Sequence, residues 1–239
     1  MKGRTALVTG GGRGIGAAIA RRLAREGAQV WVVSRTLSEI QGVAAECGAS
    51  CERCDVTVAS QVDRLARKIG PVDILVNNAG HAEGAPFVKT SFALWRRILD
   101  ANLTSAFLVT RAFVPGMIRR NYGRIVNIAS LAGKRAVPYI TAYCAAKHAL
   151  LGFNASLALE LSGKGIRVNA VCPGYVDTPM TRQNVGKISK VTGRPESEVM
   201  RLLLASLGQP RLLKADHVAE LAAALARQDC PHTGAAIDL

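Results

Sequence analysis

The sequence predicts an α/β fold, a doubly wound parallel sheet of seven strands with helices on both faces. Three observations predict it. Short apolar, β-branched runs alternate with longer amphipathic stretches along the 239 residues, which is typical of a parallel sheet covered on both sides. A glycine-rich turn joins the first run to the first amphipathic stretch. No linker or internal repeat divides the chain, so we expect a single domain over 1–239.

The alternation gives the expected elements in order. The runs predict strands at 5–9, 29–33, 50–53, 74–77, 124–128, 167–171 and 235–238, and the clearest are the β-branched runs at 124–128 and 167–171. The longer stretches predict helices near 15–27, 37–46, 58–69, 91–120, 141–162 and 215–227. Residues 177–210 interrupt the pattern, being polar and basic. We expect this segment to form one or two helices over the carboxyl edge of the sheet, as a lid.

Composition excludes several classes of protein. Hydrophobic residues make up 49% and charged residues 20%, which excludes intrinsic disorder. No apolar run reaches the ~18 residues of a membrane span, and none resembles a secretory signal, so we expect a cytoplasmic protein without a membrane partner. The net charge is +14, but the basic residues are dispersed and aromatic residues are few. We therefore expect no nucleic-acid partner.

The six cysteines include one CxxC pair, Cys51 and Cys54. A zinc site would need a second pair or histidine partners, and none follows. The sequence predicts ordinary reduced thiols and no metal site.

A glycine-rich segment follows the first predicted strand and opens the first helix. Glycines permit a tight turn and close approach of the backbone to a pyrophosphate, which the helix N-terminus then binds. In this strand–turn–helix context the motif predicts a Rossmann-type dinucleotide site. Its candidate residues are Gly10, Gly12, Arg13, Gly14, Ile15 and Gly16.

The end of the second predicted strand indicates which dinucleotide. An NAD site usually has a carboxylate here for the ribose 2′-OH, but this strand ends in Ser34 and Arg35. The planar guanidinium of Arg35 suits a 2′-phosphate, and Arg13 can reach the same group from the glycine turn. The sequence predicts NADP(H) as the cofactor; the alternative is that Arg35 is a surface residue.

Tyr143 and Lys147 form the candidate acid–base pair. At i and i+4 of a predicted helix they share one face. A nearby ammonium favours the phenolate and lowers the pKa of a tyrosine, which makes Tyr143 a candidate general acid or base. Ser130 follows a strand at its carboxyl end, where α/β folds place their chemistry.

These motifs, taken together, resemble the short-chain dehydrogenase/reductase family over essentially the whole chain. The resemblance rests on Thr9–Gly16, Asp55-Val56, the Asn-Asn-Ala-Gly run at 77–80, Asn102, Ser130, Tyr143 with Lys147, and Cys172-Pro173-Gly174 with Thr178. It implies that Ser130 polarises the substrate carbonyl and that Tyr143 gives the proton. It also implies that Lys147 lowers the Tyr143 pKa and binds the nicotinamide ribose, and that Asn102 holds a water of a proton relay.

The resemblance also implies the other cofactor contacts. Asp55 and Val56 would contact the adenine, a second group would line the adenosine ribose, and a third would flank the nicotinamide. The second group is Asn78, Ala79 and Gly80, and the third is Pro173, Gly174, Val176 and Thr178. A homotetramer is expected, although the C-terminal residues depart from the family's usual tail and leave that contact open.

The motifs are most similar to those of 3-oxoacyl-thioester reductases and polyketide ketoreductases. The resemblance implies an NADPH-dependent reduction of a 3-oxoacyl thioester or polyketide-like ketone, with acyl carrier protein or coenzyme A as carrier. Arg119, Arg120, Lys134, Arg135 and Arg182 are candidates to meet an acidic carrier near the mouth. One alternative is oxidation of a secondary or cyclic alcohol by the same residues, and another is a non-catalytic NADP(H) sensor. His81 is expected in the pocket wall; the alternative is a second acid–base role.

Overall fold

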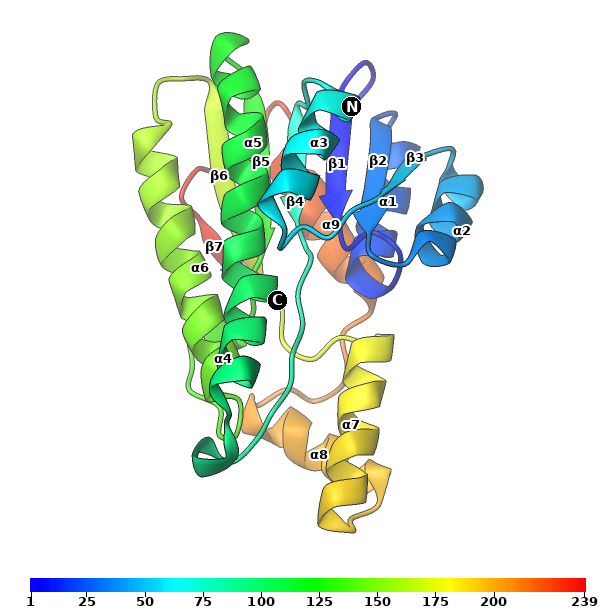
Figure 1. Cartoon of the computed structure of the whole chain (residues 1–239), viewed down its shortest axis with the longest axis vertical. Coiled ribbons are helices and arrows are strands. Elements are labelled where there is room, and N and C mark those ends of the chain that lie inside the picture. The colour runs from blue at the N-terminus through cyan, green and yellow to red at the C-terminus, as the bar shows by residue number, and fades with distance from the viewer.

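The computed structural model describes residues 1–239 and contains a seven-stranded parallel sheet (Figure 1). The strand order is β3-β2-β1-β4-β5-β6-β7, which confirms the predicted fold class. Right-handed crossovers on both sides of β1 produce this order. The strands are β1 Thr5–Thr9, β2 Gln29–Ser34, β3 Ser50–Arg53, β4 Ile74–Asn77, β5 Gly123–Ile128, β6 Ile166–Cys172 and β7 Ala236–Asp238.

The register explains why the strands read as nearly continuous apolar runs. Ala6 of β1 pairs with Val30 of β2 and with Ile74 of β4. Successive side chains point to opposite faces, so Ala6 and Val8 enter one core and Leu7 enters the other. Because helices cover both faces of the sheet, these β1 side chains are apolar on each face.

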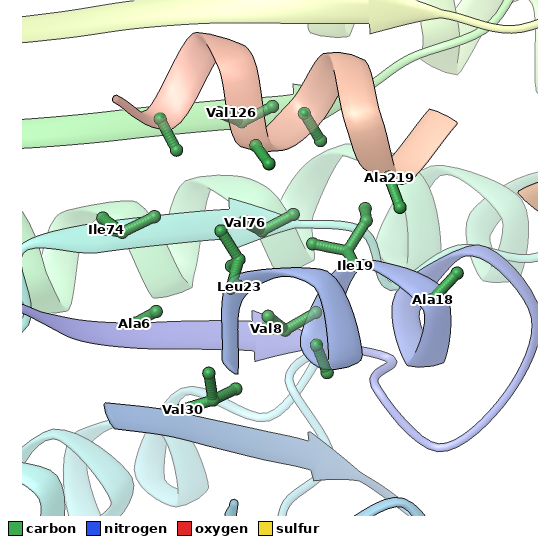
Figure 2. Packing of buried hydrophobic residues seen from close by; sticks show 14 of the residues in the cluster. Ala6, Val8, Ala18, Ile19, Leu23, Val30, Ile74, Val76, Val126 and Ala219 are labelled. Carbon is green, nitrogen blue, oxygen red and sulfur yellow. The ribbon is translucent and has the colours of Figure 1, made fainter. Parts of the chain in front are cut away.

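Helices cover both faces of the sheet. One core contains side chains of α1, α2 and α9 against β1, β2, β4 and β5; Figure 2 shows Ile19 and Leu23 of α1 beside Val8 and Val76. The other core contains α3, α5 and α6. The helices are α1 Gly14–Arg25, α2 Leu37–Cys47, α3 Ala59–Ile69, α4 Phe92–Leu99, α5 Ser105–Arg119, α6 Thr141–Glu160, α7 Pro179–Thr192, α8 Glu196–Ser206 and α9 Ala215–Ala226. Short 3-10 turns lie at Phe87–Lys89 and Leu131–Gly133.

The predicted helix at 91–120 is interrupted. Between α4 and α5 the chain forms a π-helical segment, η2 Asp100–Thr104. Asn102, inside it, donates from Nδ2 to the carbonyl oxygens of Ile98 at 2.9 Å and His81 at 2.7 Å. Such π turns are frequent at functional sites. Hydrophobic periodicity could not reveal the interruption, because it depends on a contact with a distant loop.

Helices α7 and α8 extend beyond the carboxyl ends of the strands (Figure 1). The segment is fastened where it begins and ends, since Val176 and Leu213 form a parallel bridge. Asp177 N donates to Leu213 O at 2.8 Å, and Leu213 N donates to Tyr175 O at 2.9 Å. The chain therefore leaves and rejoins the main body at one place.

None of the helices combines the length and apolar character needed to span a membrane. The cysteines are all free thiols. Cys51 packs against one core and Cys54 lies in the other, so the two sulfurs of the CxxC pair point to opposite faces of the sheet.

Candidate active site

The glycine turn after β1 is a close-packed structure. Gly10 and Gly14 have φ of +63° and +53°, in the left-handed region that favours glycine. A Cβ on Gly16 would lie 2.2 Å from Gly10 O, so no side chain fits there. These three glycines are therefore needed by the turn itself.

A buried hydroxyl joins this turn to β4. Thr9 Oγ1 accepts from the backbone amides of Asn78 and Ala79, both at 3.0 Å, and donates to Val76 O at 3.3 Å. Asn78 Nδ2 returns hydrogen bonds to Thr9 O at 2.9 Å and Gly10 O at 3.1 Å. Two motifs that are far apart in sequence thus form one rigid platform. Thr9 is a positioning residue that the sequence reasoning did not single out.

The N-terminus of α1 can receive an anion. Arg13 occupies the N-cap position without a side-chain cap, and the first turn contains no acidic residue. Unsatisfied N–H groups and the positive end of the helix dipole favour a phosphate at such a place. The turn and helix therefore fit the pyrophosphate of a dinucleotide, as predicted. Ile15 lies half-buried at the start of α1 and packs against the core below.

Three arginines surround the end of β2. Arg35 is exposed, and its side chain makes no ion pair or hydrogen bond within the chain. Arg53, opposite Ser34 in the register, donates from Nε to Arg35 O at 3.1 Å. Arg13 reaches the same region from the glycine turn, where its Nη1 lies 3.7 Å from Glu39 Oε1. This donor set fits a 2′-phosphate.

Arg53 and Glu39 were missed by the sequence reasoning. Arg53 could have been found from its position at the end of the third predicted strand, beside β2. Glu39 is in the first turn of α2 and follows the strand end by several residues. No motif marks it, and the residues at the strand end alone did not indicate a carboxylate in this region.

The adenine segment after β3 is ordered by its own side chains. Asp55 Oδ1 accepts from Thr57 N at 3.0 Å and Thr57 Oγ1 at 2.7 Å, which leaves its other oxygen available. Val56 is buried beneath it. Both residues lie beyond the carboxyl end of β3, beside the arginines, as the prediction requires.

Ser130, Tyr143 and Lys147 meet at the carboxyl ends of β5 and β6. Ser130 follows β5, and its Oγ accepts from Ala132 N at 3.1 Å and is 3.4 Å from Pro173 O. Tyr143 and Lys147 project from α6, with Lys147 Nζ 5.6 Å from the centre of the Tyr143 ring. A hydrogen bond with Ser130 is one of the influences on the Tyr143 pKa. The three predicted side chains are therefore brought together.

The ionisation of this group differs from the expectation. Burial raises the pKa of Tyr143 to about 12, and the hydrogen bond with Ser130 lowers it only in part. Burial also lowers the pKa of Lys147 to about 8, and its Nζ donates to Ile128 O at 2.8 Å. Lys147 does not depress the Tyr143 pKa as expected: its Nζ donates to the carbonyl oxygen of Ile128 and lies 5.6 Å from the centre of the Tyr143 ring.

Asn102 lies beside this group with one atom unsatisfied. Its Nδ2 makes two hydrogen bonds to backbone carbonyls, whereas Oδ1 is buried with no partner in the protein. A Cβ on Gly80 would lie 2.7 Å from that oxygen, so glycine is needed there. Buried polar atoms are rarely left unpaired, and this acceptor fits a bound water.

The segment after β6 completes the predicted site. Thr178 caps α7 by accepting from Thr181 N at 3.3 Å, and its methyl group would lie 3.2 Å from a Cβ on Gly14. Val176 is buried in the bridge to Leu213. The carbonyl oxygen of Pro173 accepts from Leu131 N at 3.0 Å. The predicted nicotinamide segment therefore touches both the glycine turn and the Ser130 loop.

Gln209 is a second positioning residue that the sequence did not reveal. Its Oε1 accepts from Tyr175 N at 2.7 Å, and its Nε2 donates to Tyr175 O at 2.8 Å and Arg211 O at 2.6 Å. A Cβ on Gly174 would lie 2.4 Å from this Oε1. The Gln209 amide thus fixes the backbone between Gly174 and Val176.

The loop after Gly80 contributes a charged cluster. His81 Nε2 lies 3.1 Å from Glu83 Oε2, which also accepts from Arg97 Nη2 at 3.0 Å. Hydrogen bonding to His81, and then the Arg97 charge, hold the pKa of Glu83 below its usual value despite partial burial. The ring of His81 is therefore engaged by Glu83, while its carbonyl supports Asn102.

Two of the basic candidates lie at the wrong edge of the sheet. Arg120 donates to Val72 O and pairs with Asp73 at the amino ends of the strands, and Arg119 precedes it at the end of α5. The expectation that they border the mouth is wrong, because α5 runs antiparallel to the strands. Lys134, Arg135 and Arg182 lie near the carboxyl edge, contacting Asp238, Leu207 and Asp177 respectively.

Comparison with known proteins gives consistent matches. The family model described as short chain dehydrogenase matches residues 4–188. A Streptomyces coelicolor protein with the provisional name ketoacyl reductase is 40% identical, over 92% of this chain and 88% of its own length. D-beta-hydroxybutyrate dehydrogenase of Rhizobium meliloti is 35% identical, over 95% and 92%.

A solved structure agrees in shape as well as sequence. It is that of a variant of actinorhodin polyketide ketoreductase with NADPH, with a TM-score of 0.92 and 36% identity. The alignment covers 99% of this chain and 95% of that one. Since the family model spans most of the residues and the relatives align nearly end to end, the chain belongs to the short chain dehydrogenase family.

Proposed function

We propose that this chain is an NADP(H)-dependent ketoreductase whose substrate is a 3-oxoacyl thioester or a polyketide-like ketone. The observation that carries the proposal is the meeting of Ser130, Tyr143 and Lys147 beside a glycine turn flanked by arginines. The ketoreductase names of similar proteins, and the NADPH named with one similar structure, support it. In this proposal the protein works as one cytoplasmic domain, with residues 177–210 as its lid.

The proposed chemistry assigns a proton to Tyr143. NADPH, when bound, supplies the hydride that reduces the carbonyl carbon. The hydroxyl of Ser130 hydrogen-bonds the substrate oxygen, and Tyr143 donates its proton to that oxygen as negative charge develops. With a pKa of about 12, Tyr143 keeps its proton at neutral pH and is ready to act as the acid.

Lys147 and Asn102 support this transfer. The Lys147 ammonium stabilises the phenolate that remains after Tyr143 has given its proton, and it binds the nicotinamide ribose. The unpaired Oδ1 of Asn102 holds a water through which a proton returns toward Lys147. Asp55, Val56, Asn78, Ala79 and Gly80 hold the adenosine, and the segment from Pro173 to Thr178 holds the nicotinamide.

The test is the oxidation of NADPH, and separately NADH, with acetoacetyl-coenzyme A as substrate. We expect the absorbance of the reduced nicotinamide to fall much faster with NADPH. A faster rate with NADH would contradict the cofactor assignment. Absence of turnover with both would contradict the substrate assignment, and cyclic ketones would then be tried.

A second candidate function is the oxidation of a secondary alcohol. The similarity to D-beta-hydroxybutyrate dehydrogenase favours it, because the same residues act in reverse. Activity with NAD⁺ and a 3-hydroxy acid, exceeding reduction with NADPH, would establish it.

We also propose a homotetramer and an anionic carrier. Phe107 on α5 and Leu159 on α6 are large apolar side chains left exposed on the outer helices, which a second copy would cover. Lys134, Arg135 and Arg182 lie near the mouth, where an acyl carrier protein or the phosphates of coenzyme A would meet them. Size-exclusion chromatography with light scattering tests the tetramer. A comparison of KM for acetoacetyl-coenzyme A and a short free ketone tests the carrier.

A further inference from the structure

A carboxylate lies among the arginines at the end of β2. Glu39 Oε1 is 3.7 Å from Arg13 Nη1, with the two side chains 34% and 51% exposed. Glu39 lies in the first turn of α2 and close to the glycine turn, since a Cβ on Gly12 would lie only 2.8 Å from Glu39 Cβ. Glu39 therefore sits directly over the glycine turn.

The other acidic side chains nearby are engaged elsewhere. Glu52 on β3 pairs with Lys68 on α3. Asp55 accepts from both donors of Thr57. Glu39 is thus the carboxylate that faces Arg13, and Arg35 and Arg53 carry the remaining charges at this edge.

We propose that Glu39 is a specificity-determining residue that weakens the preference of this chain for NADP(H) over NAD(H). This inference rests on the proposed cofactor site. A 2′-phosphate that approaches Arg13 must displace Glu39 and is repelled by its charge. A ribose 2′-hydroxyl meets no such repulsion, and a carboxylate can accept its hydrogen bond. Glu39 therefore disfavours one cofactor and favours the other.

The size of the effect follows from the exposure of the pair. An ion pair this open to solvent contributes little by itself, but the phosphate carries up to two negative charges. We expect that neutralising Glu39 raises the ratio of Kd for NADH to Kd for NADPH about threefold to tenfold. Salt should reduce the change, because the Debye length at 0.1 M is about 10 Å.

The experiment is a fluorescence titration of NADPH and NADH into the wild type, Glu39→Gln and Glu46→Gln. Glu46 lies on the same helix and pairs with Arg21 on α1, so Glu46→Gln is a matched control for loss of one carboxylate from α2. The same variants are titrated with adenosine 2′,5′-bisphosphate and adenosine 5′-monophosphate. These probes lack the nicotinamide and differ from each other only in the 2′-phosphate, so comparing them isolates the contribution of that group.

Glu39→Gln is expected to tighten NADPH and the bisphosphate and to weaken NADH and adenosine monophosphate slightly, while Glu46→Gln behaves as the wild type. An unchanged ratio in Glu39→Gln, or an equal change in Glu46→Gln, overturns the inference. A wild type that prefers NADH overturns the proposed cofactor instead. The inference about Glu39 then still stands if Glu39→Gln moves the ratio toward NADPH.

Discussion

Buried polar side chains at the two edges of the sheet, Arg124 at one and Lys147 with Asn102 at the other, differ in how fully they are hydrogen-bonded. At the amino edge, Arg124 is only 4% exposed, and it donates to the carbonyl oxygens of Gly123, Gly165, Arg227 and Gln228. At the carboxyl edge, the buried Lys147 has one backbone acceptor and Asn102 Oδ1 has none. Arg124 is therefore satisfied within the chain, whereas Lys147 and Asn102 keep unused hydrogen-bonding capacity. The amino edge is not saturated throughout, because Arg167 Nη1, beside Arg124 in the register, is buried without a partner.

This difference decides whether a buried polar group contributes to stability or is available to bind a ligand. Hydrogen bonds that are complete within the chain stabilise the folded state without a ligand. Groups left incomplete destabilise the free protein, but they can bind something from outside. We therefore expect substitutions at the amino edge to change stability, and substitutions at the carboxyl edge to change activity.

The largest effect is expected for Tyr143→Phe. Removing the proton donor should lower the reduction rate by about 10³-fold, while NADPH binding stays nearly unchanged. Tyr122→Phe is the control at the opposite edge, where the ring lies between the guanidinium groups of Arg4 and Arg124. It should retain full activity. Initial rates and cofactor titration measure both, and substantial activity in Tyr143→Phe would refute its proposed role.

Arg124→Leu tests the amino edge, where we expect a loss of stability without a loss of activity. Losing the guanidinium leaves several buried carbonyl oxygens without a donor, which should lower the free energy of unfolding by about 3 kcal/mol. The activity of the folded fraction should be unchanged. Urea unfolding measures the first quantity, and rates corrected for the folded fraction measure the second. Stability equal to the wild type would show that the four hydrogen bonds contribute little.

Arg35→Asp tests how the carboxyl edge discriminates between NADPH and NADH. It removes a charge-assisted contact and adds repulsion, so NADPH should bind about 10- to 100-fold more weakly. NADH should change by much less. Fluorescence titration with each cofactor measures the ratio. An equal loss for both would mean that Arg35 does not contact the 2′-phosphate.

The buried Lys147 ammonium, with a single hydrogen-bond acceptor, should lower the stability of the folded protein. The unfolded chain keeps the lysine proton up to a pKa near 10.5, whereas the folded chain releases it near 8. Between these values the unfolded state binds more protons, so the stability of the wild type rises with pH, and below pH 8 the full penalty is present. At pH 7, Lys147→Met should therefore be more stable than the wild type by about 1–2 kcal/mol, although inactive.

Urea unfolding of both proteins at pH 7 and pH 10 checks this expectation. The advantage of Lys147→Met should shrink at the higher pH, because the wild type then carries an uncharged amine. A constant difference would show that the ionisation of Lys147 is not its source.

The sequence predicted the sheet more fully than the site. All seven strands form within about two residues of their expected ends. For the central strands the reason is that apolar, β-branched runs buried on both faces leave little ambiguity; β3 is polar and partly exposed, so that reason does not apply to it. The break at Asn102 was not predictable, since it depends on the carbonyl of His81 across the site. Periodicity records which face of a helix is buried, and it says nothing about a hydrogen bond to a loop.

The site residues were predicted by type, and their electrostatics were not. The spacing of Tyr143 and Lys147 gave their shared face, but the pKa of each depends on burial by neighbouring elements. Thr9 and Gln209 act through hydrogen bonds to the backbone, and Glu39 acts through its side-chain pair with Arg13; these contacts form only in the folded chain. The position of Arg119 and Arg120 could have been predicted, because in a parallel sheet a crossover helix returns to the amino ends of the strands.

The clamp made by Gln209 and the Val176–Leu213 bridge has an evolutionary consequence. Because hydrogen bonds join the two ends of the α7–α8 segment to each other, the segment forms a closed loop on the main body of the protein. The entropy of closing a loop grows only slowly with its length. Insertions, deletions and replaced helices beyond Thr178, which packs against the glycine turn, would leave the cofactor platform undisturbed. The fold thus offers one place where substrate preference can diversify while the chemistry is inherited intact.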